Sequence, residues 1–356
     1  MFKDKEYEEH IIKGKELPEK GLGPARLIDL ISIGAIRFRP SIFLIERNKE
    51  LLDNLKGFEP EVILNGNFIF MDLLAGYKER IDHSVKIISL TDSYRVIYNS
   101  FSAIEHAGPS LTSHFSKLSK LFLKKRYFEY YLERYRKLLE VSDTVMVPTK
   151  KDTEDIRDKF KPYLNKVIVL PFVFISRRLG KEPDYKNARL SKSVNRILFL
   201  GAYNFWPNKE AMELIENQIA PLLPDKEFII EGNGVPVRKI KNVSYIGTVS
   251  NLKSIIDDTD MCLAPLLHGT SIKTKILEYY LAGKLIVGTS EAFNGYPVKD
   301  NFDAIIEDDI GKYAMRIENL EKNKPLMLKM QKNARNVVKK LDFKKVEADF
   351  LNAINN

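Results

Sequence analysis

The stretch from residue 261 to residue 291 constrains the fold more than any other part of this chain. Residues 261–267 form an apolar run that is too short for a helix, and a second apolar run begins at Leu285, shortly after Gly283. Between these runs, residues 272–282 place apolar side chains at helical spacing. Short buried runs on both sides of a helix are typical of parallel strands joined by a crossover helix. The sequence therefore predicts an α/β fold.

The helix predicted over 272–282 is apolar around most of its circumference and leaves one narrow polar strip. This strip consists of Ser271, Thr274, Lys275 and Glu278. A loop of small residues, 269–271, precedes the helix, so the backbone N–H groups at the helix start and the positive end of its dipole face whatever lies above the strands. Such a helix start binds anions. We predict an anion site at this point, and an i,i+3 surface ion pair between Lys275 and Glu278 is the weaker alternative.

Two runs in this stretch carry a resemblance to a known family. They read Ala-Pro-Leu-Leu-His-Gly-Thr-Ser-Ile-Lys-Thr-Lys-Ile-Leu-Glu at 264–278 and Ala-Gly-Lys-Leu-Ile-Val-Gly-Thr at 282–289. Together they resemble the donor-sugar signature of GT-B-fold retaining glycosyltransferases of the family-4 type, also called group 1 glycosyl transferases. The resemblance implies that Lys275 grips the donor diphosphate and that Glu278 binds the nucleotide ribose. The first glutamate of the family's Glu-x7-Glu motif would fall at Thr270 and is absent, and Tyr279 stands where alanine is usual.

The resemblance also implies the architecture of the whole chain. GT-B proteins are α/β proteins with two Rossmann-like, doubly wound domains that face a cleft. We place an N-terminal, acceptor-side domain at 1–175, a polar linker at 176–195 and the nucleotide-sugar donor domain at 196–341. The last helix, 342–356, is expected to pack back onto the first domain. Gly21 and Gly23 would form the glycine loop of the N-terminal domain, although no convincing strand precedes them.

Further donor-site residues follow strand ends in the second domain. Strands predicted at 196–201, 226–231 and 243–249 each lead into a turn, and by resemblance these turns seat the donor. The donor-binding candidates are Gly201, Asn208, Gly232, Gly234, Thr248, Val249, Gly269, Thr270, Ser271, Lys273, Thr274, Lys275 and Glu278. Asn208 is also predicted to cap a helix over 209–222. Because Ala202 stands where many relatives have arginine, a second phosphate cation would come from Lys209 or Lys273.

Two side chains of the first domain join Lys275 and Glu278 as catalytic candidates. Asp92 follows the strand predicted at 85–90, and the carboxyl ends of parallel strands face the ligand crevice of a doubly wound sheet. A turn-forming aspartate is the alternative. His106 lies in a predicted loop, where it would serve a hydroxyl acceptor or be a solvent-exposed histidine without a catalytic part.

The formal net charge of +9 favours anionic partners such as nucleotide sugars, anionic lipid or nucleic acid. A helix predicted over 111–141 interleaves basic with aromatic side chains, so residues 113–140 suit peripheral contact with an anionic membrane. The alternative is a helix with one face on its own sheet and a solvated basic back. No nucleic-acid recognition motif accompanies this helix, and we expect no nucleic-acid partner.

Several classes of protein are excluded by what the sequence lacks. The single cysteine, Cys262, lies in a predicted buried strand, so no intramolecular disulfide is available. The chain has no signal-peptide-like segment and no apolar run of membrane-spanning length. Zinc-ligand spacing is absent, and we expect neither a metal nor a cofactor beyond the nucleoside diphosphate sugar that serves as co-substrate. We expect a cytoplasmic location, with peripheral contact at the inner membrane face as the further option.

The leading hypothesis is a glycosyltransferase that moves a sugar from a UDP- or GDP-sugar to a hydroxyl acceptor with retention of anomeric configuration. The acceptor would be a glycan, a lipid-linked molecule or a protein. The absent glutamate at Thr270 motivates one alternative, a nucleotide-sugar-binding module without transfer activity. An epimerase in the same fold and a DNA-modifying glucosyltransferase, the latter suggested by basicity alone, are the others.

Overall fold

The computed structural model describes residues 62–65, 74–75, 78–79, 84–94, 128–129, 132–171, 190–269, 272–341 and 343–355. The chain divides into two compact units, and most described residues belong to the unit formed by Leu64–Phe68 and Ile87–Asn356. Some of the predicted features lie outside the described residues. These are Gly21, Gly23, His106, Thr270, Ser271 and residues 113–127 of the basic, aromatic stretch.

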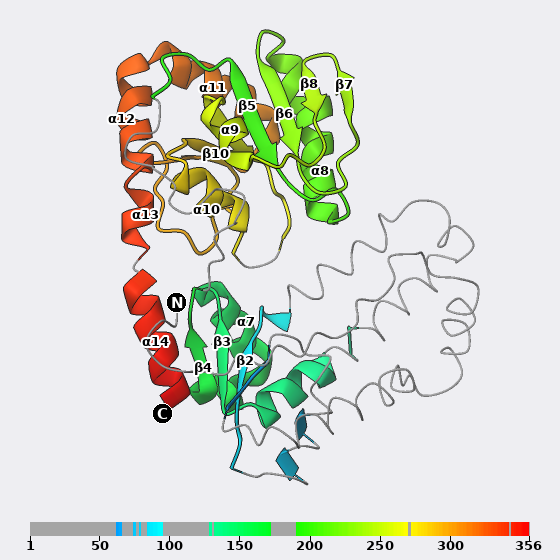
Figure 1. Ribbon diagram of the computed structural model, residues 1–356, viewed down its shortest axis with the longest axis vertical. Coiled ribbons are helices and arrows are strands. Elements are labelled where there is room, and N and C mark those ends of the chain that lie inside the picture. The colour runs from blue at the N-terminus through cyan, green and yellow to red at the C-terminus, as the bar shows by residue number, and fades with distance from the viewer. Residues whose placement is uncertain are drawn as a thin grey trace, which may run out of the picture. The chain divides into compact units, whose positions relative to one another are not determined.

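A seven-stranded sheet occupies the C-terminal half of the chain, with strand order β11-β10-β9-β5-β6-β8-β7 (Figure 1). Its strands are β5 (Arg196–Leu200), β6 (Glu227–Glu231), β7 (Arg238–Ile240), β8 (Val243–Tyr245), β9 (Met261–Ala264), β10 (Ile286–Gly288) and β11 (Ile305–Ile306). All neighbouring pairs are parallel except β7 with β8, which are antiparallel at one edge. The parallel strands confirm the predicted α/β class, whereas β7 was not predicted because its Arg-Lys-Ile sequence is mostly solvent-exposed.

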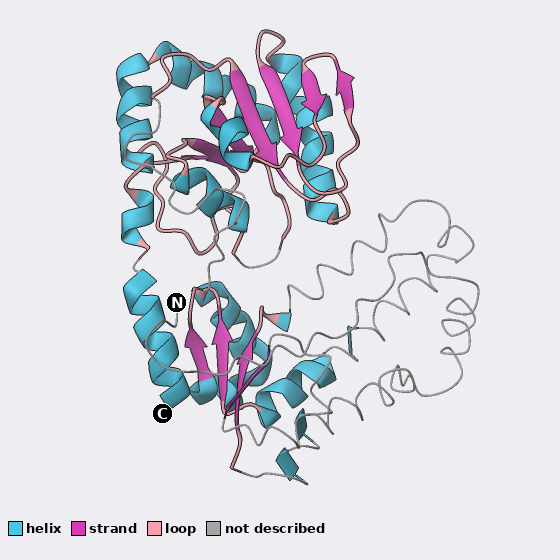
Figure 2. Cartoon of the chain, viewed as in Figure 1, coloured by secondary structure: helices cyan, strands magenta, loops and turns pink. Residues whose placement is uncertain are grey.

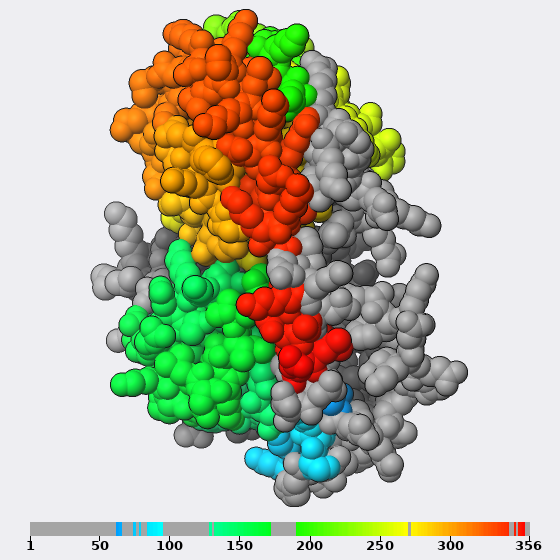
Figure 3. Space-filling view, turned by 90° about the vertical axis from the view of Figure 1, so that its left-hand side faces the viewer, coloured from blue at the N-terminus to red at the C-terminus, as the bar shows by residue number. Residues whose placement is uncertain are grey.

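Helices connect these strands and surround the sheet (Figure 1). They are α8 (Trp206–Leu214), continued by the π-helical turn η4 (Ile215–Ile219) and the 3-10 turn η5 (Ala220–Leu222), then α9 (Leu252–Asp257), α10 (Thr274–Leu281), η6 (Ile310–Lys312), α11 (Tyr313–Lys322), α12 (Lys324–Ala334) and α13 (Val337–Lys340). A last helix, α14 (Phe343–Asn355), follows them along the chain. In the space-filling view, the orange to red-orange residues of α11–α13 form one continuous surface (Figure 3). A single hydrophobic core, built from residues between Val194 and Val338, fills the space between sheet and helices.

A second, four-stranded sheet lies earlier in the chain, with order β1-β2-β3-β4 (Figure 2). It contains β1 (Val62–Asn65), β2 (Lys86–Leu90), β3 (Thr144–Val147) and β4 (Val167–Val169), and the β2–β3 and β3–β4 pairs are parallel. Helix α7 (Lys150–Phe160) starts in a capping box between Thr149 and Asp152, and the 3-10 turn η2 (Lys161–Lys166) follows it. None of the described helices combines the length and the apolarity needed to cross a lipid bilayer.

Candidate functional site

Helix α10 carries the described part of the polar strip. The side chains it buries are Ile276, Leu277, Tyr279, Tyr280 and Leu281. Of the others, Thr274 is exposed, while Lys275 and Glu278 are half-buried. The residue before the helix, Lys273, makes no side-chain capping bond to it. The positive end of the helix dipole therefore lacks the usual N-cap side chain and suits an anion, as predicted for this element.

Lys275 lies in an apolar setting with a single described hydrogen-bond acceptor. Its Nζ donates to Asn208 Oδ1 at 2.5 Å and lies 4.3 Å from the centroid of the Phe199 ring. Burial lowers the pKa of Lys275 from 10.5 to about 7; Glu278 opposes this shift and Lys273 adds to it. A diphosphate would supply the negative charge that this desolvated ammonium group needs.

The turn after β5 is shaped around Asn208. Gly201 has no room for a side chain, because a Cβ there would lie 2.7 Å from Asn208 Cγ and 2.9 Å from the Phe199 ring. The Asn208 side chain donates to the carbonyl oxygen of Ala202 at 3.1 Å. The prediction that Asn208 caps the next helix is wrong: α8 begins at Trp206 with Phe205 as N-cap. Pro207 in the first turn favours this earlier start, and Asn208 contacts Lys275 instead.

The loops after β5, β6 and β8 lie against one another. At Gly232 a Cβ would lie 1.9 Å from the Gly201 carbonyl oxygen, and Gly234 has a positive φ of 71°. Thr248 Oγ1 donates to the Gly232 carbonyl at 3.1 Å. The Val249 N–H donates to Glu231 Oε1 at 3.1 Å, so a buried carboxylate at the end of β6 fixes the loop after β8. Sequence reasoning missed Glu231, although a charged residue that ends an apolar strand was a usable signal.

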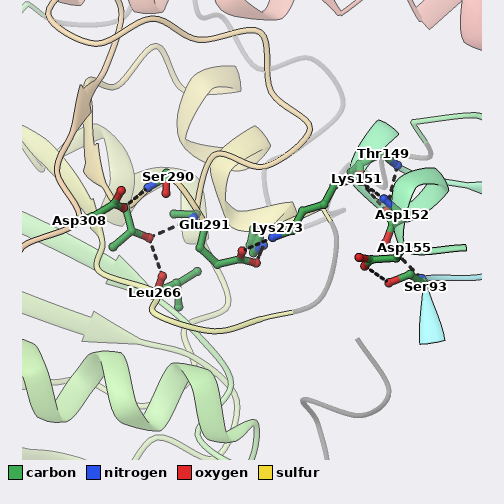
Figure 4. A network of polar contacts seen from close by, with 12 residues as sticks. Ser93, Thr149, Lys151, Asp152, Asp155, Leu266, Lys273, Ser290, Glu291 and Asp308 are labelled. Atoms are coloured by element: carbon green, nitrogen blue, oxygen red, sulfur yellow. Dashed lines mark hydrogen bonds and ion pairs between the residues drawn. The ribbon is translucent and has the colours of Figure 1, made fainter. Parts of the chain in front are cut away.

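Lys273 is buried beside the loop before α10 and is paired with Glu291 (Figure 4). Its Nζ donates to Glu291 Oε1 at 2.5 Å, and its Cε lies 3.0 Å from where a Cβ of Gly269 would be. Burial lowers the pKa of Lys273, and Glu291 opposes that shift. Glu291 Oε2 also accepts a hydrogen bond from Lys151 Nζ at 3.0 Å. Sequence reasoning did not identify Glu291, because its partners are 18 and 140 residues away along the chain.

Asp92 lies two residues beyond the carboxyl end of β2, as predicted. The pKa of Asp92 is raised to about 6, mainly by burial; the charge of nearby Asp152 contributes to this rise, and Lys273 opposes it. The neighbouring backbone is held in place, because Tyr135 OH donates to the Asp92 carbonyl oxygen at 3.0 Å and the Ser93 N–H donates to Asp152 Oδ1 at 3.1 Å. Asp92 is thus a half-buried carboxylate that can take up or release a proton near neutral pH.

The structure brings the predicted donor-site residues of the seven-stranded sheet to the carboxyl ends of β5, β6, β8 and β9. Direct contacts join Gly201, Asn208 and Lys275, and others join Gly232 with Thr248 and Gly269 with Lys273. Among the described residues, no group of three or more His, Cys, Asp or Glu side chains is arranged to hold a metal ion. The chemistry available here is anion binding by two partly desolvated lysines and a helix start.

Several solved structures have a similar fold. Anabaena HepE, in complex with UDP and glucose, has a TM-score of 0.62 at 11% identity over 90% of this chain and 84% of that chain. Sucrose-phosphate synthase of Thermosynechococcus elongatus has a TM-score of 0.59 at 13% identity over 88% of this chain and 78% of its own. TarM of S. aureus has a TM-score of 0.60 at 12% identity over 86% of this chain, which spans only 57% of TarM. These similarities show a GT-B fold with two Rossmann-like domains.

Part of the sequence also matches a known family. Residues 194–323 match the model of the family described as glycosyl transferases group 1. This part of the chain is a group 1 glycosyl transferase domain, which makes the protein a transferase. The matched segment begins just before β5, ends just after α11 and includes both Lys275 and Glu278. No curated protein matches the chain.

Proposed function

We propose that this glycosyltransferase moves a sugar from a nucleoside diphosphate sugar, most simply a UDP-sugar, to a hydroxyl acceptor, with retention as in the family-4 type. One observation carries the proposal: Lys275, with its pKa lowered to about 7, lies on the first turn of α10 between Asn208 and the Phe199 ring. A partly buried ammonium group at a helix start is matched to a diphosphate. The complexes of HepE with UDP and with UDP-glucose support UDP as the nucleotide.

The costly step of such a reaction is departure of the diphosphate from the anomeric carbon. Lys275 and the N–H groups at the start of α10 would stabilise the negative charge that grows on the leaving phosphate. Glu278, one turn later on the same polar strip, would accept hydrogen bonds from the ribose hydroxyls. The loop fixed by Glu231, with Thr248 and Val249, would seat the base.

For the acceptor, Asp92 has the properties of a group that orients a hydroxyl. Its pKa of about 6 leaves it largely ionised at neutral pH, so it would accept a hydrogen bond from the incoming hydroxyl group. In a front-face mechanism the departing phosphate takes the hydroxyl proton, and the sugar keeps its anomeric configuration. Two paired carboxylates, as in a double displacement, are then not required.

The second candidate function is nucleotide-sugar binding without transfer. The observation that favours it is Thr270, which stands at the first glutamate of the family motif. Such a protein would keep the diphosphate and ribose contacts of Lys275 and Glu278 but would not turn over the donor.

Calorimetric titration with UDP tests the donor site. Glu278→Gln removes a charged acceptor without changing shape, and charged hydrogen bonds contribute about 1.5–3 kcal/mol, so UDP should bind roughly tenfold to a hundredfold more weakly. Glu318→Gln on the exposed face of α11 is the matched control and should bind UDP like the parent protein. Unchanged UDP affinity in Glu278→Gln would refute the proposal that Glu278 binds the ribose hydroxyls.

Product analysis tests transfer and its stereochemistry. The purified protein is incubated with UDP-glucose and a panel of hydroxyl acceptors, and NMR spectra of the anomeric proton are recorded over time. Retention gives a product with the α configuration of the donor, and an inverted product contradicts the retaining proposal. Tight UDP binding without transfer or donor hydrolysis supports the non-catalytic alternative.

A further inference from the structure

The segment 322–341, which contains α12 and α13, has seven basic residues and no acidic residue. Its formal charge of +7 compares with +9 for the whole chain. The basic residues are Lys322, Lys324, Lys329, Lys332, Arg335, Lys339 and Lys340. All six lysines are exposed, and of these only Lys340 has an ion pair within the part of the chain that the structure describes. The segment therefore presents concentrated positive charge that the described protein does not neutralise.

The central lysines of this segment share one side of the two helices. The opposite side is buried and consists of Met327, Met330, Gln331, Ala334, Val337 and Val338. Lys329, Lys332 and Lys339 are spaced three and seven residues apart, which places them on one helical face. This face continues from α12 to α13, because the intervening Arg335 and Asn336 both have α-helical backbone angles. The two helices lie at the surface of the molecule (Figure 3). We call the face of Lys329, Lys332 and Lys339 the lysine stripe.

An exposed aromatic ring lies beside the end of the lysine stripe. Phe302, in the turn before β11, is 42% exposed, and Lys340 Nζ lies 5.7 Å from its ring centroid. The Phe302 carbonyl oxygen accepts a hydrogen bond from Asn333 Nδ2 of α12 at 2.9 Å, so this turn is held against the helix. The adjacent Asp303 adds no exposed negative charge, because it is fully buried and paired with Lys340. Positive charge and an exposed apolar ring thus occur together on this surface.

This composition is complementary to the surface of an anionic lipid bilayer. Anionic headgroups attract nearby lysines, and an aromatic side chain enters the boundary between headgroups and acyl chains. A second copy of the chain is a poor partner, because two lysine stripes would repel each other. Nucleic acid is also less well matched, since arginine is the better phosphate ligand and single strands stack their bases on several aromatic side chains.

We propose that the lysine stripe and Phe302 dock the protein on membranes that contain anionic phospholipid. The lysines supply an attraction that salt screens, and the Phe302 ring is buried among the headgroups. This surface is distinct from the basic, aromatic stretch at 113–140. It belongs to the donor-binding part of the chain, because α13 packs against α10. Docking here does not depend on which donor or acceptor the protein uses.

Cosedimentation of the full-length protein with lipid vesicles tests the proposal. The parent protein should bind vesicles of phosphatidylcholine mixed with phosphatidylglycerol, should not bind phosphatidylcholine alone, and should be released by salt. The double variant Lys329→Gln/Lys332→Gln should partition into the mixed vesicles roughly tenfold to thirtyfold more weakly. The matched control Lys239→Gln/Lys241→Gln removes the same charge from two exposed lysines at the β7 edge of the sheet and should bind like the parent.

The contribution of the ring is measured separately. Phe302→Ala should weaken partition into the mixed vesicles roughly threefold to tenfold, since the buried apolar area is lost. Leu222→Ala, at another exposed apolar side chain (55% exposed), should have no effect. Calorimetry with UDP on the same samples should give the parent affinity in every variant, which shows that the donor-binding part is folded.

Three results would overturn the proposal. The first is a parent protein that does not bind the mixed vesicles. The second is equal vesicle binding by Lys329→Gln/Lys332→Gln and the control, because the protein then docks through another surface, such as 113–140. The third is binding to soluble polyphosphate without binding to the mixed vesicles, which would make the lysine stripe a site for a soluble polyanion.

Discussion

At the scale of single residues, Lys275 carries an ammonium group in surroundings that disfavour its charge in the unliganded protein. Its surroundings include the Phe199 ring and a second lysine, Lys273, and both burial and the like charge disfavour the ammonium form. Glu278 provides the opposing charge. A residue kept in this state is ready for an anion, since a bound diphosphate supplies the missing counter-charge.

The first prediction is that UDP binding takes up a proton at Lys275. The pKa of this lysine is about 7 in the unliganded protein, below its ordinary 10.5, and a bound diphosphate moves it upward. Above the unliganded pKa the bound state holds more protons than the free state, so UDP affinity should fall as pH rises from about 7 to about 9, by up to roughly tenfold per pH unit. Phosphate groups with a pKa of about 6 are already ionised in this window and add no slope.

Calorimetry in two buffers with different ionisation enthalpies measures this proton uptake directly. Lys275→Met should bind UDP more weakly at neutral pH and should lose the pH dependence. The control Lys299→Met, at an exposed lysine, should retain it. A parent protein whose UDP affinity is flat across this range would refute the assignment of Lys275 to the diphosphate.

The second prediction concerns Gly232 and Gly234, which both lie in the turn after β6 but have different surroundings. A Cβ at Gly232 would lie 1.9 Å from the backbone oxygen of Gly201, and backbone on both sides cannot move cheaply, so Gly232→Ala should cost more than about 3 kcal/mol of folding free energy. Gly234→Ala meets only side-chain atoms of Asn204 at 3.6 Å and pays for a positive φ, about 1–2 kcal/mol. Urea unfolding of both variants measures the difference, and equal losses would contradict the close approach of the two loops.

At the scale of elements, Tyr279 explains a departure from the family pattern. The parallel pairing of β5 with β9 extends through Leu198 and Cys262 and then stops. The hydroxyl group of Tyr279 continues the connection, because it accepts a hydrogen bond from the Leu200 N–H at 2.7 Å and donates to the Leu263 carbonyl at 3.4 Å. A tyrosine on α10 thus joins the helix to the ends of both strands that lead to the donor loops.

The third prediction follows from this bridge. Tyr279→Phe leaves a buried N–H of Leu200 without the hydroxyl acceptor and should destabilise the protein by about 1–3 kcal/mol. Tyr280→Phe is the matched control on the same helix, since its hydroxyl makes a single long bond to the Asp303 carbonyl at 3.4 Å and should cost less. Thermal unfolding of the two variants ranks them, and a larger loss in Tyr280→Phe would show that the bridge contributes little.

Elements were predictable from the sequence where one physical signal dominated. Strand β9 and helix α10 were predicted within a few residues, because buried runs, helical spacing and Gly283 all agree there. The start of α8 was misplaced, since Asn208 is a good capping residue by type and only the contact with Lys275 shows its other use. Glu231 and Glu291 were missed for a similar reason: their partners are set by tertiary structure, which spacing along the chain does not encode.

At the scale of the whole molecule, the donor-binding part has the components of an independent folding unit. Among the residues that the structure describes, the fully buried members of its hydrophobic core lie between Val194 and Val338. The segment before β5 is hydrogen-bonded to α12. The Ser191 N–H donates to Gln331 Oε1 at 2.8 Å, and Gln331 Nε2 donates to the Ser191 carbonyl oxygen at 2.9 Å. Asp260, at the start of the β9 region, accepts from the Arg196 N–H at 3.0 Å. The domain boundary predicted near residue 196 is therefore preceded by a residue, Ser191, that is already hydrogen-bonded to the donor domain.

The last prediction is that residues 190–341 fold alone and bind UDP. This fragment retains all strands of the seven-stranded sheet, the described core around it, and the contacts of Lys275 with Asn208 and of Val249 with Glu231. It should unfold in one cooperative transition, and UDP should raise its melting temperature because only the folded state binds the ligand. A fragment that starts at residue 202 lacks β5, a central strand between β9 and β6, and should neither fold nor bind. If UDP stabilises the full chain but not the 190–341 fragment, then residues outside the fragment complete the nucleotide site and the donor domain is not self-sufficient.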